Sequence, residues 1–130
     1  MSHFMLAVHS SPDAPTQPDP TPEQQQAWFE RIVALETELQ ETGAWVFSGA
    51  MTDPDRARVV RTGDDAPIVS DGPFAESKEH LAGFYVIEVD DLDEAMAWAA
   101  RVTACVGRPI EVRPFAATGA VADNAPPGMG

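Results

Sequence analysis

Residues 68–89 constrain the fold of this chain more than any other segment. They contain a short apolar stretch, the turn formers Asp71, Gly72 and Pro73, a run of charged side chains, and a strand pattern over residues 81–89. Glycine adopts backbone angles closed to other residues and proline fixes its own φ, so we expect a rigid turn that holds side chains in defined positions. The strand at 81–89 is apolar on both sides, which predicts that both of its faces are covered.

Two amphipathic helices flank this segment. The first begins at Thr21, a capping residue followed by Pro22 and, three positions after the cap, by Gln24. It ends where Gly43 supplies a left-handed residue. Its apolar stripe consists of Trp28, Ile32, Leu35 and Leu39. The second helix is capped by Asp91, and its expected buried stripe consists of Leu92, Ala95, Ala99 and Val102.

Alternating and apolar stretches predict six strands, at residues 3–9, 44–48, 57–62, 66–70, 81–89 and 110–114. The third and fourth are expected to form a hairpin with Val60 and Ile68 facing inward. With this hairpin set aside the order is βαββαβ. That order predicts an α+β, ferredoxin-like fold with a β-hairpin insertion, in which an antiparallel sheet carries both helices on one face. The bare second face of the sheet predicts a homodimer.

The length of 130 residues suits one domain with its own core. We expect this domain to span residues 1–115. Residues 116–130 consist mainly of small residues, proline and glycine, and are expected to form a loosely ordered tail.

The charge balance argues against two classes of partner. Eight Lys and Arg stand against 21 Asp and Glu, a formal net charge of −13, whereas nucleic acids and anionic membranes are bound through basic side chains. Cys105 is the single cysteine, so no disulfide within the chain is expected and the default location is cytoplasmic. The first residues lack the basic and apolar pattern of a signal peptide, and no apolar run reaches membrane-spanning length.

Three motifs carry a resemblance to a known family. They are VSDGPFAESKE at 69–79, LAGFY at 81–85 and IEVRPF at 110–115. Together they resemble the DGPF branch of the YCII-related proteins, with the likeness extending in element order over residues 3–115. The resemblance implies a dimeric α/β barrel, in which two ferredoxin-like subunits bring their sheets face to face.

The resemblance implies less about function. Members are mostly uncharacterised, some are encoded beside or fused to extracytoplasmic-function sigma factors, and related barrels include muconolactone isomerases, chlorodismutases and antibiotic monooxygenases. The suspected active centre of the wider group is a His–Asp pair. Its histidine normally follows the first strand, but residues 11–22 contain none and His9 precedes them. The position of Asp71 corresponds to the aspartate.

Asp71 and His9 are the candidate catalytic residues. A carboxylate at Asp71, partly desolvated between Phe74 and Phe84, would have a raised pKa and could act as general acid or base. It could equally do no more than cap the turn. His9 could form a proton-transfer pair with Asp71 if their strands are neighbours, or be a half-buried strand-end residue.

Glu76, Lys78, Glu79 and Arg61 are the candidate ligand-binding residues. Lys78 could bind a polar or anionic ligand while a neighbouring carboxylate orients it, although such a charge run is also typical of a solvated loop. Arg61, with Arg58 and Arg113, could bind a carboxylate at a pocket mouth or pair with acids on adjacent strands. The sequence is compatible with both roles, ligand binding and surface ion pairing.

No metal and no cofactor are expected. The histidines are scattered, and neither a zinc motif nor a glycine-rich phosphate loop occurs. The three tryptophans are interpreted as core residues: Trp28, Trp45 and Trp98.

These observations favour a homodimeric acid–base enzyme or binding protein for a small polar molecule. Proton transfer, as in isomerisation or elimination, is the chemistry that its side chains offer. The alternative is a non-catalytic regulatory or interaction domain whose acidic surface meets a basic partner, with a sigma-factor link that rests on the resemblance alone.

Overall fold

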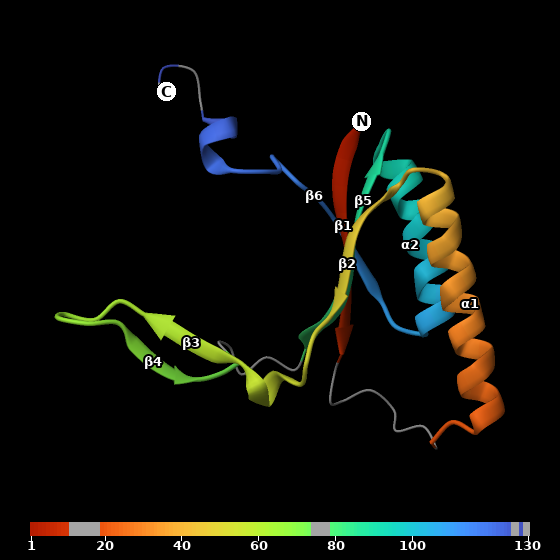
Figure 1. Ribbon diagram of the computed structural model, residues 1–130, viewed down its shortest axis with the longest axis horizontal. Coiled ribbons are helices and arrows are strands. Elements are labelled where there is room, and N and C mark those ends of the chain that lie inside the picture. The colour runs from red at the N-terminus through yellow and green to blue at the C-terminus, as the bar shows by residue number, and fades with distance from the viewer. Residues whose placement is uncertain (11–18, 74–78, 126–127, 129–130) are drawn as a thin grey trace.

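Two helices pack on one face of a four-stranded antiparallel sheet in the computed structural model, which describes residues 1–10, 19–73, 79–125 and 128 (Figure 1). The sheet strands are β1 (Ser2–Ser10), β2 (Trp45–Ala50), β5 (His80–Val89) and β6 (Ile110–Pro114). The helices are α1 (Pro22–Glu41) and α2 (Leu92–Val106). The remaining elements are the strands β3 (Arg58–Arg61) and β4 (Ile68–Asp71) and the 3₁₀ turns η1 (Pro54–Arg56) and η2 (Val121–Asn124).

The strand order of the main sheet is β2-β5-β1-β6, and the paired strands run antiparallel. This order, with the helices connecting β1 to β2 and β5 to β6, is consistent with a ferredoxin-like fold. The expected α+β class, the antiparallel sheet and the two helices on one face are therefore confirmed. The second copy that a barrel requires stays a prediction.

The first helix follows its local signals. The Thr21 side chain accepts a hydrogen bond from the backbone N–H of Gln24, whose side chain accepts one from the Thr21 N–H, which completes the capping box. Leu35 and Leu39 are buried, and Gly43 follows the helix at a φ of +79°. Trp28 is 45% exposed, so its assignment to the core is wrong.

The second helix packs through Trp98 and the smaller residues Ala95, Ala99 and Val102, and Asp91 caps it as expected. Leu92 is 48% exposed, which contradicts its place in the buried stripe. Arg101 links the two helices, because its guanidinium binds the carboxylate of Glu38 and lies over the ring of Trp98. This contact holds the Glu38 pKa below its ordinary value, chiefly through the hydrogen bond from Arg101.

The core lies between the helices and one face of the sheet. Alternate residues of β5, Tyr85, Ile87 and Val89, are buried on this face, while Phe84 and Val86 between them are partly exposed on the other. The largest fully buried side chains are Leu6, Leu39, Ile87 and Val102. We call the two sides of the sheet the covered face and the open face.

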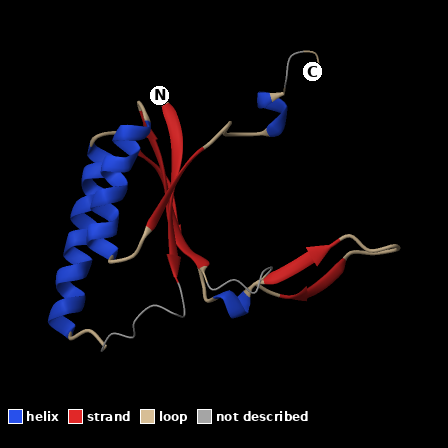
Figure 2. Cartoon of the chain, turned by 180° about the vertical axis from the view of Figure 1, so that it is seen from behind, coloured by secondary structure: helices blue, strands red, loops and turns tan. Residues whose placement is uncertain are grey.

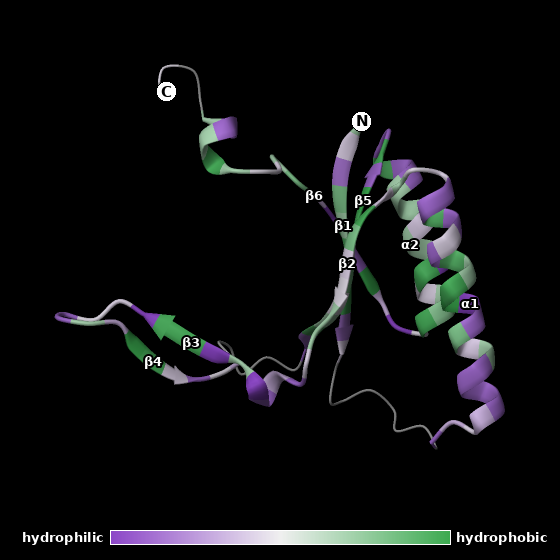
Figure 3. Cartoon of the chain, viewed as in Figure 1, coloured by the Kyte–Doolittle hydropathy of each residue, from purple (hydrophilic) through white to green (hydrophobic). Residues whose placement is uncertain are grey.

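The β3–β4 hairpin forms a separate two-stranded sheet that projects on the open-face side, away from the helices (Figures 1 and 2). Val59 is buried, whereas Val60 and Ile68 are 66% and 56% exposed, so the inward orientation expected for those two residues is wrong. Val60 lies opposite Val69, which is 64% exposed, and the hairpin strands are hydrophobic over much of their length (Figure 3).

The C-terminal segment after β6 also leaves the sheet on the open-face side (Figure 1). Its turn η2 is closed by Asn124, whose amide donates to the carbonyls of Thr118 and Ala120. The expected domain boundary at residue 115 stays a prediction. Neither helix in the described ranges is both long and apolar enough to cross a bilayer.

Candidate functional site

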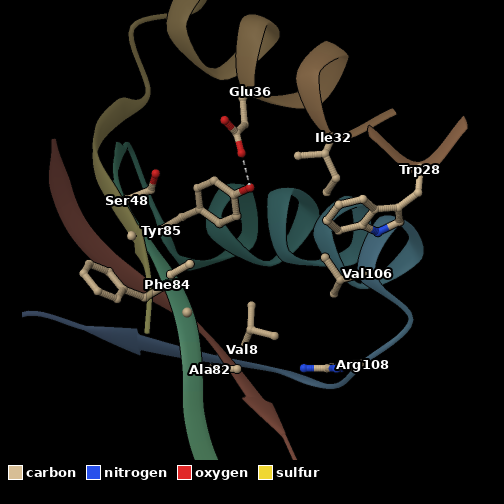
Figure 4. Close-up of a pocket in the computed structure, with 13 residues that line it drawn as sticks. Val8, Trp28, Ile32, Glu36, Ser48, Ala82, Phe84, Tyr85, Val106 and Arg108 are labelled. Carbon is tan, nitrogen blue, oxygen red and sulfur yellow. Dashed lines mark hydrogen bonds between the residues drawn. The ribbon is translucent and has the colours of Figure 1, made fainter. Parts of the chain in front are cut away.

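A cavity of about 600 Å³ opens on the covered face, between α1, the sheet and the end of α2 (Figure 4). We call it the α1 cavity. Its walls are mainly apolar, and its polar side chains are Glu36, Ser48, Tyr85 and Arg108. A cavity of this size with a few polar groups has the proportions of a small-molecule site.

A short hydrogen bond joins two of the polar groups. The Tyr85 hydroxyl donates to Oε2 of Glu36 over 2.6 Å, which connects the central strand β5 to α1. Burial, and then the hydrogen bond to Glu36, raise the pKa of Tyr85 above its ordinary value. Tyr85 therefore remains a protonated hydrogen-bond donor at neutral pH, and Glu36 is the carboxylate that it orients.

Local sequence explains how these groups reach the cavity. Trp28, Ile32 and Glu36 are spaced by four residues on α1, so they share one side of the helix and line the same wall. On β5, Gly83 allows a close approach of the neighbouring strand, because a Cβ there would lie 3.0 Å from the Gly49 carbonyl oxygen. The cavity thus has a helical wall with a carboxylate and a sheet wall with a phenol.

Arg108 supplies the positive charge of the cavity. It follows Gly107, which ends α2 at a φ of +69°, so the chain turns and brings the arginine to the lining near Val106. The side chain is exposed, and within the described ranges its guanidinium has no hydrogen-bond or ion-pair partner. Its donors are therefore available to a ligand.

Asp71 lies outside the α1 cavity, at the end of the projecting hairpin strand β4. Its side chain is 88% exposed, and its Oδ1 lies 3.3 Å from Nε of Arg58. The expected burial of this carboxylate beside Phe84 is wrong for the single chain, and Phe74 lies outside the described residues. The proposed catalytic role of Asp71 stays a prediction.

The other sequence-predicted residues also lie away from the α1 cavity. Nε2 of His9 is 3.8 Å from Oε1 of Glu111 on the neighbouring strand, and no contact brings His9 to Asp71 within the described part of the chain. Arg61 donates to the Ser70 hydroxyl over 3.4 Å within the hairpin. Glu79 is exposed directly before β5, while Lys78 and Glu76 lie outside the described residues.

Sequence reasoning missed Glu36, Tyr85 and Arg108 as a group. One signal was available on α1, because Glu36 continues the four-residue spacing of Trp28 and Ile32 and so places a carboxylate beside the apolar stripe. Arg108 carries no comparable signal, since only the tertiary fold brings the end of α2 to this wall.

No group of three or more His, Cys, Asp or Glu side chains arranged to hold a metal ion occurs among the residues that the structure describes.

Comparison with known proteins identifies the family. Residues 2–123 match the model of the YCII-related domain, which is nearly the whole chain. The chain belongs to the YCII-related family. A relative by sequence is an uncharacterised protein of Rhizobium meliloti (strain 1021), 37% identical over 68 residues. That alignment covers 52% of this chain and 55% of the relative, so the chain spans about half the length of the curated relative it matches.

Proposed function

We propose that this YCII-related protein binds a small organic molecule in the α1 cavity and exchanges a proton with it. The observation that carries the proposal is the 2.6 Å hydrogen bond between Tyr85 and Glu36 in the wall of a mainly apolar cavity. Glu36 accepts the proton, and Tyr85 fixes the orientation of its carboxylate. A carbon acid loses its proton to Glu36 and regains one at another carbon, an isomerisation that needs no cofactor.

Solvent deuterium exchange tests this proposal. Phenylpyruvate has an acidic benzylic C–H next to its ketone, and NMR in D₂O follows the loss of that proton. We expect the wild-type protein to accelerate the exchange and Glu36→Gln to abolish the acceleration. Glu30→Gln, an exposed carboxylate on the same helix outside the cavity lining, is the matched control and should exchange as the wild type does. Equal exchange with and without protein would sink the proposal of proton transfer.

We also propose that a second copy covers the open face to form the dimeric α/β barrel. Phe47 and Phe84 lie together on this face with ring centroids 5.8 Å apart, and Phe47 is 60% exposed. The hairpin and the C-terminal segment project on the same side, where they flank the space for a second sheet (Figures 1 and 2). Such an apolar patch on a sheet face is typical of a contact between subunits.

Light scattering coupled to size-exclusion chromatography tests the dimer. We expect twice the chain mass of 14.0 kDa for the wild type and the single-chain mass for Phe47→Lys. Phe29→Lys is the matched control, because Phe29 is 57% exposed on α1, away from the open face, and its variant should stay dimeric. A wild-type chain that elutes at 14.0 kDa would exclude the barrel.

Asp71 and His9, with Lys78, Glu76, Glu79 and Arg61 as ligand-binding residues, form a second candidate site, which the resemblance to the DGPF branch supports. The specific observation in its favour is the pairing of Ser10 with His80, which sets the end of β1 beside the start of β5. The phenylpyruvate assay separates the two sites. Exchange that is lost in Asp71→Asn but retained in Glu36→Gln would assign the chemistry to the second site.

The alternative function is a non-catalytic interaction domain, located in the cytoplasm and associated with an extracytoplasmic-function sigma factor. Its support is the net charge of −13 together with the family resemblance. A sigma factor held by this acidic surface should dissociate as salt is raised, because ionic strength screens exposed charges. Co-purification that survives high salt, or that fails at low salt, would count against this function.

A further inference from the structure

We infer that the α1 cavity selects a compact apolar molecule that carries an anionic group, and that Arg108 binds this anion. The inference rests on the proposed ligand-binding function and adds the chemical class of the ligand. Two ionisable side chains of the same lining, Glu36 and Arg108, differ in their hydrogen-bond partners. Glu36 already accepts a hydrogen bond from the Tyr85 hydroxyl, whereas the Arg108 guanidinium has no acceptor among the described residues.

The lining divides into an apolar body and two polar ends. The apolar residues of the lining include Val8, Trp28, Ile32, Ala82 and Val106. In the close-up, Glu36 and Tyr85 lie at the α1 end, and Arg108 lies across the cavity beyond Val8 and Val106 (Figure 4). A ligand that places its anion at Arg108 therefore extends an apolar portion over Trp28 and presents its other end to Glu36.

The chemistry of arginine narrows the ligand class. A guanidinium offers a planar fork of N–H donors that matches a carboxylate or phosphate in two parallel hydrogen bonds. The mainly apolar walls favour a ligand whose remaining surface is aromatic or aliphatic, because its burial removes apolar area from water. The net charge of −13 repels anions at long range, but that repulsion is screened beyond roughly 10 Å at 0.1 M salt. The attraction of the anion to Arg108 acts at contact distance, so it outweighs the screened repulsion by the net charge.

Three one-ring probes of equal size separate the effect of charge from the effect of shape. They are benzoate, benzamide and benzylamine, titrated by calorimetry into the full chain, into Arg108→Gln and into Arg56→Gln. Arg56 is an exposed arginine of η1 outside the cavity lining, so its variant carries the same charge change at a remote place. We expect the wild type to bind benzoate most tightly. Arg108→Gln should weaken benzoate by about tenfold to a hundredfold and leave benzamide unchanged, because hydrogen bonds to a charged group contribute about 1.5–3 kcal/mol.

The outcomes separate this inference from the function on which it rests. Benzoate that binds no more tightly than benzamide, or equal benzoate affinity in Arg108→Gln and Arg56→Gln, overturns the anionic class and leaves an apolar-ligand cavity intact. Tightest binding of benzylamine overturns it too, because the cavity would then select a cation. No binding of any of the three probes overturns both proposals.

Discussion

The two faces of one sheet differ in how they are completed. On the covered face, Leu6 and Ile87 are fully buried against helices of the same chain, and the polar pair Tyr85–Glu36 stands at the edge of this core. On the open face, the neighbouring residues Phe47 and Phe84 form an aromatic pair that the chain itself leaves partly uncovered. One strand, β5, therefore contributes buried side chains to the core on one side and partly exposed apolar side chains to an uncovered surface on the other.

The ionisable side chains are also divided between the two faces. The open face carries two histidine–glutamate contacts, His3 with Glu88 at 3.0 Å and His9 with Glu111 at 3.8 Å. The covered face carries the hydrogen bond from Tyr85 to the Glu36 carboxylate and, in the same cavity lining, Arg108. Partly exposed pairs of this kind stabilise a fold weakly, whereas the Tyr85–Glu36 hydrogen bond joins the central strand to α1 in the wall of a cavity.

The largest expected effect comes from a matched pair of truncations on β5. Ile87→Ala should lower the free energy of unfolding by about 2–5 kcal/mol, because it leaves a cavity in the core. Val86→Ala, one residue away on the open face, should lower it by about 1 kcal/mol or less when both are measured in the Phe47→Lys background, where no second copy covers that face. Urea unfolding measures both values, and equal losses would remove the distinction between the faces.

The hairpin tests how far the open-face contact extends. Replacing Val60 and Val69 together by threonine retains the side-chain shape and strand preference but removes apolar surface that is more than half exposed in the single chain. We expect dimer dissociation to become at least about tenfold easier, measured by sedimentation over a range of concentrations. Val33→Thr, at a 43% exposed position on α1 away from the open face, is the control. An unchanged dimer would confine the contact to the main sheet.

A smaller effect is expected where the hydrogen bond of the covered face is removed. Tyr85→Phe leaves the ring in place but deprives Glu36 of its donor, and a hydrogen bond to a charged group contributes about 1.5–3 kcal/mol. We expect the free energy of unfolding to fall by about 1.5 kcal/mol, the lower end of that range, because the bond is only partly buried. Ser48→Ala, which changes another polar side chain of the same lining, should cost less. Chemical denaturation provides both values, and the reverse order would contradict the assigned contact.

The smallest effect is a shift in a titration. Tyr85 is the single tyrosine, so the ultraviolet absorbance of tyrosinate reports its ionisation alone. The pKa of the Tyr85 hydroxyl is raised in the folded state. The contribution of this hydroxyl to stability is therefore complete below the ordinary pKa of 10.0, and it is lost as the pH rises from there through the folded pKa. We expect the midpoint in the native protein to exceed 10.0 and to fall in Glu36→Gln. A native midpoint at the ordinary value would show that the phenol is neither buried nor bonded as described.

The sequence predicted the elements that depend on local chemistry. The capping box at Thr21, the cap at Asp91 and the left-handed Gly43 are each decided within a few residues, and the structure has them all. The α+β class and the antiparallel sheet with two helices followed from the element order βαββαβ, because few arrangements accommodate that order.

What the sequence missed depends on register and on distant contacts. Val60 was expected to face inward, but the hairpin pairs it with Val69 on an exposed side, and a shift of one residue exchanges the two faces of a strand. Trp28 has the spacing of a core residue but belongs to the part of α1 that borders the cavity. The charged run after Asp71 predicts a site next to the hairpin, whereas the polar groups of the cavity come singly from α1, β2, β5 and the end of α2.

The central claim is that the covered face holds the ligand and the open face holds a second copy. Amide and indole chemical shifts of the isotope-labelled protein, recorded as benzoate is added, test it most directly. We expect shifts at the Trp28 indole, Val106 and Arg108, with Phe47 and Met5 on the open face unaffected. Shifts confined to the open face, or none at saturating benzoate, would contradict it.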